Sequence, residues 1–273
     1  MSHDQQPLAV PASAYVTREN GACASTDLTR GPWHPDHQHG GPPIALIARS
    51  IERAAAALGL PHIARLTANL LRPVPIDELT VQVLTEYAGR NVAHFSARMH
   101  AGGKEVVRCT AVAQREAALD LPPNLAGHPL PQAPRPVEQS PAERFPFSTK
   151  TIGYQDLIES RIAEGAMFRG PSAVWFRMRY PLVAGEVPSA LQRVAVAADS
   201  GNGISAILDF RSYIFVNSDL TINLLRRAEG EWICIDARTL LGPDGGGLAE
   251  GRIFDAGGLI GRSTQSLAVR RRD

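Results

Sequence analysis

The densest group of chemically competent side chains lies in the segment Trp33-His-Pro-Asp-His-Gln-His39. It offers four possible metal ligands within six positions, at His34, Asp36, His37 and His39. Helical zinc motifs place two histidines four residues apart, and that spacing is absent here, while Pro35 stiffens the middle of the segment. We therefore favour a loop over the mouth of a site, with His39 close to the helix that follows. We expect no metal and no cofactor, with a bound metal as the less favoured alternative.

Asp199 is a second candidate, because a carboxylate followed by Ser200-Gly-Asn-Gly203 stands at a predicted interruption of a helix. Two glycines inside a helix cost about 1 kcal/mol each relative to alanine, so a break there is plausible. Asp199 could cap a short helix that restarts at Ser200, or it could serve chemistry, and position alone leaves the two alternatives even. The nucleophile motif G-x-S-x-G and the phosphate-binding motif G-x-x-x-x-G-K-[ST] are both absent from the sequence, which disfavours serine-hydrolase and P-loop chemistry.

The elements that would position these residues follow from hydrophobic spacing. Residues 41–58 carry apolar side chains on one face at helical spacing, at Ile44, Ile47, Ala48, Ile51, Ala54 and Ala55. Ser189 could cap a second helix, with Leu191, Val194, Ala195 and Ala198 on one face. Short strands are predicted within residues 15–29 and 158–180. Long strands are predicted where Phe95, Ala97 and Met99, and later Ile233, Ile235 and Ala237, alternate with other side chains.

The chain contains one sharp break and one internal repeat. Residues 117–150 hold eight prolines, so we interpret them as an extended linker between units at residues 1–116 and 151–273. Thr67-Ala-Asn-Leu-Leu-Arg72 recurs as Thr221-Ile-Asn-Leu-Leu-Arg226. Ala101-Gly-Gly103 recurs as Ala256-Gly-Gly258, at positions that suit hairpin turns, and Arg108-Cys-Thr110 recurs as Arg262-Ser-Thr264. Three matches in the same order indicate a duplication. Each copy has a helix followed by long antiparallel strands, so the predicted class is α+β, with each sheet wrapped around a long helix.

These features resemble the bacterial acyl-CoA thioesterase II family and its thioesterase-like relatives. The resemblance is carried by His39-Gly-Gly-Pro-Pro-Ile-Ala-Leu46 at the first helix start, Ala198-Asp-Ser200 in the second helix, and the long C-terminal strands. It implies a double hotdog fold, in which two tandem hotdog halves imitate a dimer. It also implies a water held by Asp199, Asn217 and Gln265, where Asn217 stands in place of the family's threonine.

Those residue types suit thioester hydrolysis. A carboxylate can accept a proton from water, and two amides can orient that water toward the thioester carbonyl. Backbone N–H groups of Gly40 and Gly41 at the helix start would stabilise the developing oxyanion, with His39 beside them. The counterparts of Gln265 and Asn217 in the first copy are Ala111 and Ile63, so we expect one active site and not two.

Two other functions stay open. The chain could be a non-catalytic acyl-CoA-binding protein of hotdog fold. It could also hydrate an enoyl-CoA, although the relevant hotdog enzymes carry a histidine five residues after the aspartate, where this chain has Ile204. Arg270-Arg-Arg272 could meet coenzyme A phosphates, but a solvated basic tail is the favoured interpretation.

Composition narrows the class further. The chain has 273 residues, 44% hydrophobic and 20% charged, with a formal net charge of +1, so no global field attracts nucleic acid or an anionic membrane. Three unpaired cysteines and the lack of a signal peptide or long apolar stretch lead us to expect a cytoplasmic enzyme of lipid metabolism. The expected partners are the acyl-CoA substrate and further copies of the chain, because a pseudo-dimer leaves sheet edges for a homo-oligomer to pair.

Overall fold

A computed structural model describes residues 9–122, 129–146 and 151–272. The elements of the first part are β1 (Tyr15–Thr17), β2 (Cys23–Ser25), the 3₁₀ turn η1 (Asp27–Thr29), α1 (Gly41–Ala57), β3 (His62–Leu70), β4 (Glu78–Ala88), β5 (Val92–Ala101) and β6 (Lys104–Gln114). The later part holds η2 (Val137–Gln139), α2 (Tyr154–Leu157), β7 (Ile158–Glu164), β8 (Ser172–Met178), α3 (Ala190–Ala198), α4 (Gly201–Ile204), β9 (Tyr213–Asn217), β10 (Asp219–Leu224), β11 (Ile233–Leu241), β12 (Gly246–Asp255) and β13 (Gly258–Arg271).

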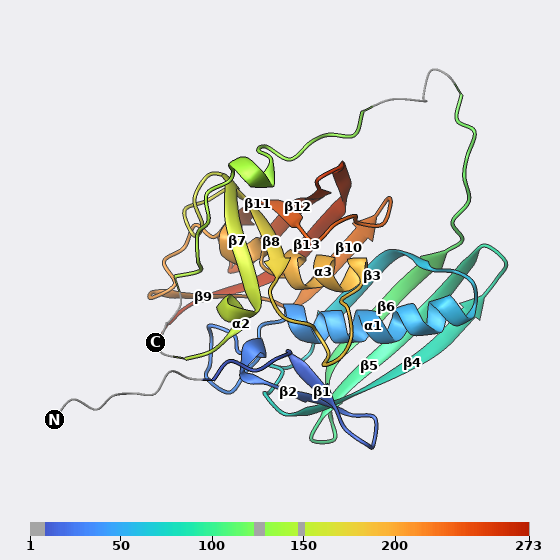
Figure 1. Ribbon diagram of the computed structural model, residues 1–273. Helices are drawn as coiled ribbons and strands as arrows, with labels where there is room; N and C mark the ends of the chain where they lie inside the picture. Colours follow the sequence, from blue (N-terminus) through green and yellow to red (C-terminus); the bar gives the residue numbers. More distant parts are fainter. Residues whose placement is uncertain (1–8, 123–128, 147–150, 273) are drawn as a thin grey trace.

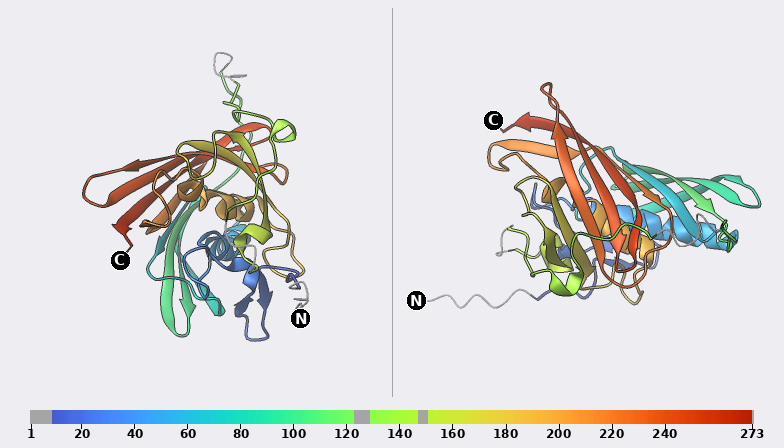
Figure 2. Two further views of the ribbon diagram at one scale, coloured as in Figure 1. Left: turned by 90° about the vertical axis from the view of Figure 1, so that its left-hand side faces the viewer. Right: turned by 90° about the horizontal axis from the view of Figure 1, so that it is seen from above.

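The strands of the described residues form one antiparallel sheet of 13 strands. The order is β1-β2-β4-β5-β6-β3-β10-β13-β12-β11-β8-β7, with β9 paired to β13. The helices α1 and α3 lie side by side on one face of this sheet, which curves around them (Figures 1 and 2). The predicted α+β class with antiparallel strands is confirmed.

The sheet is joined at its centre by the repeated segments. Strand β3 pairs with β10, and in that register Thr67 lies opposite its own repeat Thr221, whose hydroxyl donates to that of Thr67 over 3.1 Å. Thr67 also faces Thr110, as Thr221 faces Thr264, and these two partners are repeat counterparts as well. The repeated segments are therefore paired with each other and with equivalent neighbours on either side of Thr67 and Thr221.

The two helices differ in length. Helix α1 has 17 residues, and the predicted apolar face is buried, with Ala54 only partly so. Helix α3 has nine residues, because the chain turns at Asp199 into the short α4, whose glycines favour a break. The expectation of a long helix in the second half is therefore wrong, whereas its predicted cap is confirmed, since the Ser189 side chain accepts from the Gln192 N–H.

The proline-rich stretch does more than connect. Its residues 133–137 cover the outer face of the second half, where Val137 packs with Trp175, Cys234 and Phe254. The Trp175 indole N–H donates to the Arg135 carbonyl over 2.9 Å. Cys234 is buried for this reason, although its position in the alternation places it on the face opposite the main core.

The hairpin turns fall where the repeat predicts them. Strands β5 and β6 are joined by Gly102-Gly103, at φ values of 52° and 75° that residues with a Cβ rarely adopt. Strands β12 and β13 are joined at Ala256-Gly257.

Candidate active site

Asp199 is the centre of the candidate site. It follows the last residue of α3 with helical φ and ψ, and its side chain is only 4% exposed. Both carboxylate oxygens contact residues of other elements. The Asn217 side-chain N–H, at the end of β9, donates to Oδ1 over 2.8 Å, and Nδ1 of His39 lies 2.9 Å from Oδ2. The carboxylate therefore serves neither α3 nor α4 as a cap, which disfavours the capping alternative.

The His39 ring has a defined orientation. It stacks on the ring of Tyr154 in α2, with centroids 3.7 Å apart and planes 3° from parallel. The Tyr154 hydroxyl donates to the Val196 carbonyl over 2.8 Å and lies 2.8 Å from the Ser200 hydroxyl. Burial raises the pKa of Tyr154, so it stays neutral and acts as a fixed platform. Sequence analysis did not single out Tyr154, and no motif around it would have done so.

The proton on the His39–Asp199 contact can be assigned from chemistry. Nδ1 of His39 lies near both the Asp199 carboxylate and the Gly41 N–H, the latter at 3.2 Å. An unprotonated nitrogen would repel an ionised carboxylate at 2.9 Å, so Nδ1 carries a proton that it donates to Asp199. The Gly41 N–H is directed at both this nitrogen and the carboxylate, and with Nδ1 protonated only the carboxylate is left to accept from it.

These donors decide the charge of Asp199. Burial alone raises the pKa of this carboxyl, but the nearby His39 and the hydrogen bonds from His39, Asn217 and the Gly41 N–H outweigh burial. The net result is a pKa below the usual aspartate value. Asp199 is therefore a buried and ionised carboxylate at neutral pH.

The glycines at the start of α1 allow this close approach. A Cβ at Gly40 would lie 2.8 Å from Oδ2 of Asp199, and one at Gly41 would lie 2.8 Å from the Val196 carbonyl. Pro42 and Pro43 have no N–H, and the Gly41 N–H is already directed at the His39–Asp199 pair. The Gly40 N–H finds no acceptor in the described part of the chain. Of the two predicted oxyanion donors, Gly40 is the one left for a ligand.

The Gln265 side chain approaches Asp199 from β13, but it binds backbone groups and not the carboxylate. Its side-chain N–H donates to the Asp199 carbonyl over 3.1 Å, and its Oε1 accepts from the Asn202 N–H over 2.9 Å. The residue is 2% exposed. Gln265 therefore fixes the junction of α3 and α4, while Asn217 and His39 contact the carboxylate itself.

A cavity of about 330 Å³ opens onto this group. Asp199, Asn217, His39 and Gly40 line it, together with an aromatic side that sequence analysis did not anticipate, formed by Trp33, Phe145, Phe168, Phe210 and Phe215. Its volume is at the lower end of the range of ligand pockets, and a few polar groups meeting in an apolar cavity are typical of a site for a small ligand.

Comparison with protein families decides the assignment. A model of the acyl-CoA thioesterase C-terminal domain matches residues 130–269, and a model of the acyl-CoA thioesterase N-terminal domain matches residues 29–114. The chain belongs to the acyl-CoA thioesterase family. Membership makes it a thioester hydrolase, as the sequence predicts. No protein of curated function matches it.

Solved structures agree with this family at the level of the fold. A candidate thioesterase from Novosphingobium aromaticivorans DSM 12444 is 21% identical, with 95% of this chain and 99% of that chain covered and a TM-score of 0.69. A candidate thioesterase II from Thermobifida fusca YX is 18% identical, with 95% and 96% covered and a TM-score of 0.72. A conserved protein with a hot dog fold from Alicyclobacillus acidocaldarius is 16% identical, with 89% and 90% covered and a TM-score of 0.66.

Two other segments that the sequence singled out in this thioesterase, the histidine-rich loop and the arginine-rich end, lie near the cavity. The rings of His34 and His37 stack with centroids 4.3 Å apart, and the described residues contain no group of three or more His, Cys, Asp or Glu side chains placed to hold one metal ion. Arg270, Arg271 and Arg272 are exposed, as a solvated tail requires, but Arg272 also has defined contacts. Its guanidinium lies over Trp33 and Phe210, and its Nε donates to the Phe210 carbonyl over 2.9 Å.

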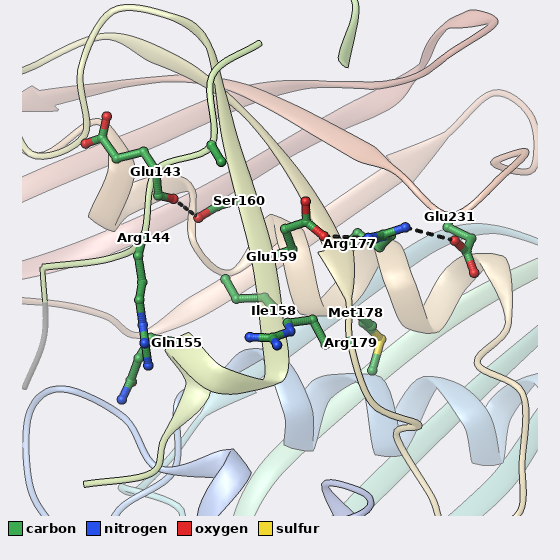
Figure 3. Close-up of a pocket in the computed structure, with 11 residues that line it drawn as sticks. Glu143, Arg144, Gln155, Ile158, Glu159, Ser160, Arg177, Met178, Arg179 and Glu231 are labelled. Atoms are coloured by element: carbon green, nitrogen blue, oxygen red, sulfur yellow. Dashed lines mark hydrogen bonds and ion pairs between the residues drawn. The ribbon is translucent and has the colours of Figure 1, made fainter. Parts of the chain in front are cut away.

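A larger open hollow of about 780 Å³ lies along β7, away from Asp199. Figure 3 shows that charged side chains dominate it, and they pair with one another: Arg177 contacts Glu159 and Glu231. Arg144 pairs with Asp156. None of the predicted site residues lines this hollow. We therefore place the candidate active site of the thioesterase at the smaller cavity.

No helix in the described part of the chain is long and apolar enough to cross a membrane.

Proposed function

We propose that this chain hydrolyses an acyl-CoA thioester to the free acid and coenzyme A, with Asp199 as the group that accepts a proton from the attacking water. The observation that carries this proposal is an ionised, buried carboxylate in the wall of a ligand-sized cavity, held by side chains from both halves of the chain.

The carboxylate has capacity left for a water. An ionised carboxylate offers about four lone-pair sites. Asn217, His39 and the Gly41 N–H occupy three of them. A water that donates to the remaining site would sit at the cavity wall beside the Asn217 side chain. Asn217, which replaces the family's threonine, contributes by orienting the carboxylate, and Gln265 contributes by fixing its backbone.

The carbonyl oxygen of the thioester needs a donor when it becomes an oxyanion. The Gly40 N–H is available for this, and it lies at the partially positive N-terminal end of α1. Loss of one such donor typically lowers kcat by about 10²-fold to 10³-fold. Hydrolysis then proceeds by attack of the water on the carbonyl carbon, transfer of its proton to Asp199 and departure of the coenzyme A thiolate, which is protonated on release.

We further propose that residues 1–116 and 151–273 are two hotdog copies joined by residues 117–150, and that they share one active site. The strand order is symmetric about the β3–β10 pair, and Thr67 faces its own repeat. The matches to separate N-terminal and C-terminal domain models support two units, although the second match begins at residue 130, within the proposed linker. The first-copy positions Ile63 and Ala111 are apolar and buried, so that copy offers no side chains for a water.

The experiment measures free thiol release from a panel of acyl-CoAs by the purified protein, with Asp199→Asn and Asp236→Asn compared. Asp236 is a matched control, because its carboxylate pairs with Arg252 and does not line the cavity. We expect hydrolysis by the wild type and Asp236→Asn, and its loss in Asp199→Asn. Binding of acyl-CoA without hydrolysis by the wild type would instead support a binding protein. Including crotonyl-CoA and following loss of its double bond tests the hydratase alternative.

A further inference from the structure

A second cavity of about 540 Å³ adjoins the active-site cavity. The two have four wall residues in common, Pro32, Trp33, Phe168 and Phe210. The second cavity has no residue of the Asp199 group in its lining. The four shared side chains thus lie between the smaller cavity, which contains Asp199, and a larger cavity, which does not.

The centre of this partition is the contact between Trp33 and Phe210. Their ring centroids are 4.7 Å apart, and Trp33 also meets Phe215 edge-on at 5.3 Å. Arg272 covers both rings of the pair, with its guanidinium 5.8 Å from Trp33 and 5.0 Å from Phe210. Contacts of this kind favour a fixed position for both rings, so the partition is a defined barrier.

Phe168 also lies between the two cavities, and its backbone conformation is unusual. Its φ of 62° lies in the left-handed region, which a bulky residue rarely adopts. Its N–H donates to the Ile204 carbonyl over 3.1 Å, and its ring meets Phe145 edge-on. Backbone strain of this kind persists where surrounding contacts hold it, and it often accompanies ligand sites.

The lining of the cavity is of two chemical kinds. Trp33, Phe210 and Phe215 form an aromatic group whose rings contact one another. Arg72 and Ser218 supply a cation and a hydroxyl, and they are neighbours because the Leu70 N–H donates to the Ser218 carbonyl. The aromatic group suits the acyl arm of a thioester held at Asp199, and the cation and hydroxyl suit its polar coenzyme A arm.

We infer that the Trp33–Phe210 contact is the end stop for the acyl chain, so that the enzyme prefers short to medium acyl groups and excludes longer ones from the second cavity. This inference rests on the proposed function of the Asp199 site. It assigns Trp33 and Phe210 as specificity-determining residues that touch the end of the chain and take no part in the chemistry.

The test compares Trp33→Ala and Phe210→Ala with the wild type on butanoyl-, hexanoyl-, octanoyl-, dodecanoyl- and hexadecanoyl-CoA. Leu71→Ala is the matched control, because Leu71 lines the active-site cavity but not the second one. One methylene that fits or clashes in an apolar pocket changes kcat/KM by roughly 10-fold to 200-fold. We therefore expect each partition variant to raise kcat/KM for hexadecanoyl-CoA relative to hexanoyl-CoA by about tenfold or more, and Leu71→Ala to leave that ratio unchanged.

Several results would overturn the inference. One is a wild type that already hydrolyses hexadecanoyl-CoA best. Another is a length profile that both partition variants leave unchanged. A KM raised equally for every chain length would place the coenzyme A arm, not the acyl arm, at Trp33. If Trp33→Ala proves poorly folded, Phe210→Ala still tests the inference. Trp33→Phe, which keeps an aromatic ring at this position, should retain most of the wild-type length profile.

A binding experiment separates this inference from the proposed function. S-alkyl-CoA thioethers of increasing chain length cannot be hydrolysed, and their affinity is measured by calorimetry on the wild type and Trp33→Ala. A shift of preferred length in Trp33→Ala supports the partition even if the wild type hydrolyses no acyl-CoA. If affinity depends on chain length in the same way in the two proteins, the inference about the partition is refuted, even if hydrolysis at Asp199 is established.

Discussion

Replacing Asp199 with asparagine tests the proposed chemistry with the least change of shape. The native carboxylate accepts from Asn217 at Oδ1 and from His39 at Oδ2. An asparagine amide can satisfy only one of these two donors, because its nitrogen faces the other one. One donor–donor contact arises unless His39 changes tautomer, and an unmet buried donor costs about 1–3 kcal/mol. Some loss of stability is therefore expected together with the loss of the proton acceptor.

The kinetic effect should be larger than the effect on stability. A positioned general base contributes about 10²-fold to 10⁴-fold to the rate. We expect Asp199→Asn to lower kcat by about 10²-fold or more, equivalent to roughly 2.7 kcal/mol in the activation barrier, with little change in KM. The assay is thiol release at saturating acyl-CoA, with each variant checked for folding by circular dichroism.

A second variant distinguishes Asp199 from its partner. His39→Asn places a side-chain N–H near the position of Nδ1, so the hydrogen bond to Asp199 can persist, while Nε2 is lost. If Asp199 is the base, His39→Asn should keep kcat within about tenfold of the wild type, well above Asp199→Asn. A kcat as low as that of Asp199→Asn would make Nε2 of His39 the proton acceptor.

The pH dependence of kcat provides an independent check. Because the pKa of Asp199 is lowered, the acid limb of kcat should lie below the usual aspartate value of about 3.9, within the range where the protein stays folded. An unchanged kcat in Asp199→Asn would refute the reasoning outright. A limb near the ordinary histidine value of about 6.5 that disappears in His39→Asn would refute the assignment of the base.

Further predictions concern the surroundings of Asp199. Gln265→Ala should lower kcat less than Asp199→Asn, and chemical denaturation should show a loss of about 1–3 kcal/mol, because buried backbone groups lose their partner. Gly40→Ala should lower kcat by about tenfold or more in the thiol assay, since its Cβ would meet the carboxylate at 2.8 Å, whereas Gly246→Ala has open space and should not. Ala111→Gln should create no second site when added to Asp199→Asn, and thermal melting should show destabilisation by about 1–3 kcal/mol from overpacking. The lowered pKa of Asp199 stabilises the fold at pH values above its unfolded pKa, and this contribution is lost as pH falls through the folded pKa. Melting temperatures measured from neutral to acid pH should therefore fall less in Asp199→Asn than in the wild type.

The elements of this chain could be predicted from spacing because local physics decides them. A helix from Gly41, a capped helix after Ser189 and a hairpin at Gly102-Gly103 each depend on a few neighbouring residues. The break after Ala198 could be anticipated for the same reason, although the resulting shortness of α3 was not. The interpretation of the proline-rich segment as an extended connection omitted the cover that Val137 provides, since composition does not reveal which surface a segment packs on.

The sequence predicted which residues lie near Asp199 better than it predicted their contacts. Asp199, Asn217, Gln265, His39 and the two glycines do lie together. The resemblance to a family could place them in one region, but it could not say that Gln265 binds backbone while His39 binds the carboxylate. Side-chain partners depend on distances of a few tenths of an ångström, which packing decides.

The sequence by itself showed the repeated segments, the alternation of apolar and polar residues, and the apolar residues Ile63 and Ala111 at the positions that the repeat aligns with Asn217 and Gln265. These are properties of residue order, and they hold for any arrangement of the chain in space. Only the tertiary structure decided that Thr67 pairs with Thr221 at the centre of the sheet. That pairing sets α1 beside α3, which brings His39 to Asp199 across the two halves and leaves Trp33 against Phe210. Contacts between residues so far apart in sequence form only when the halves pack, because no local preference links them.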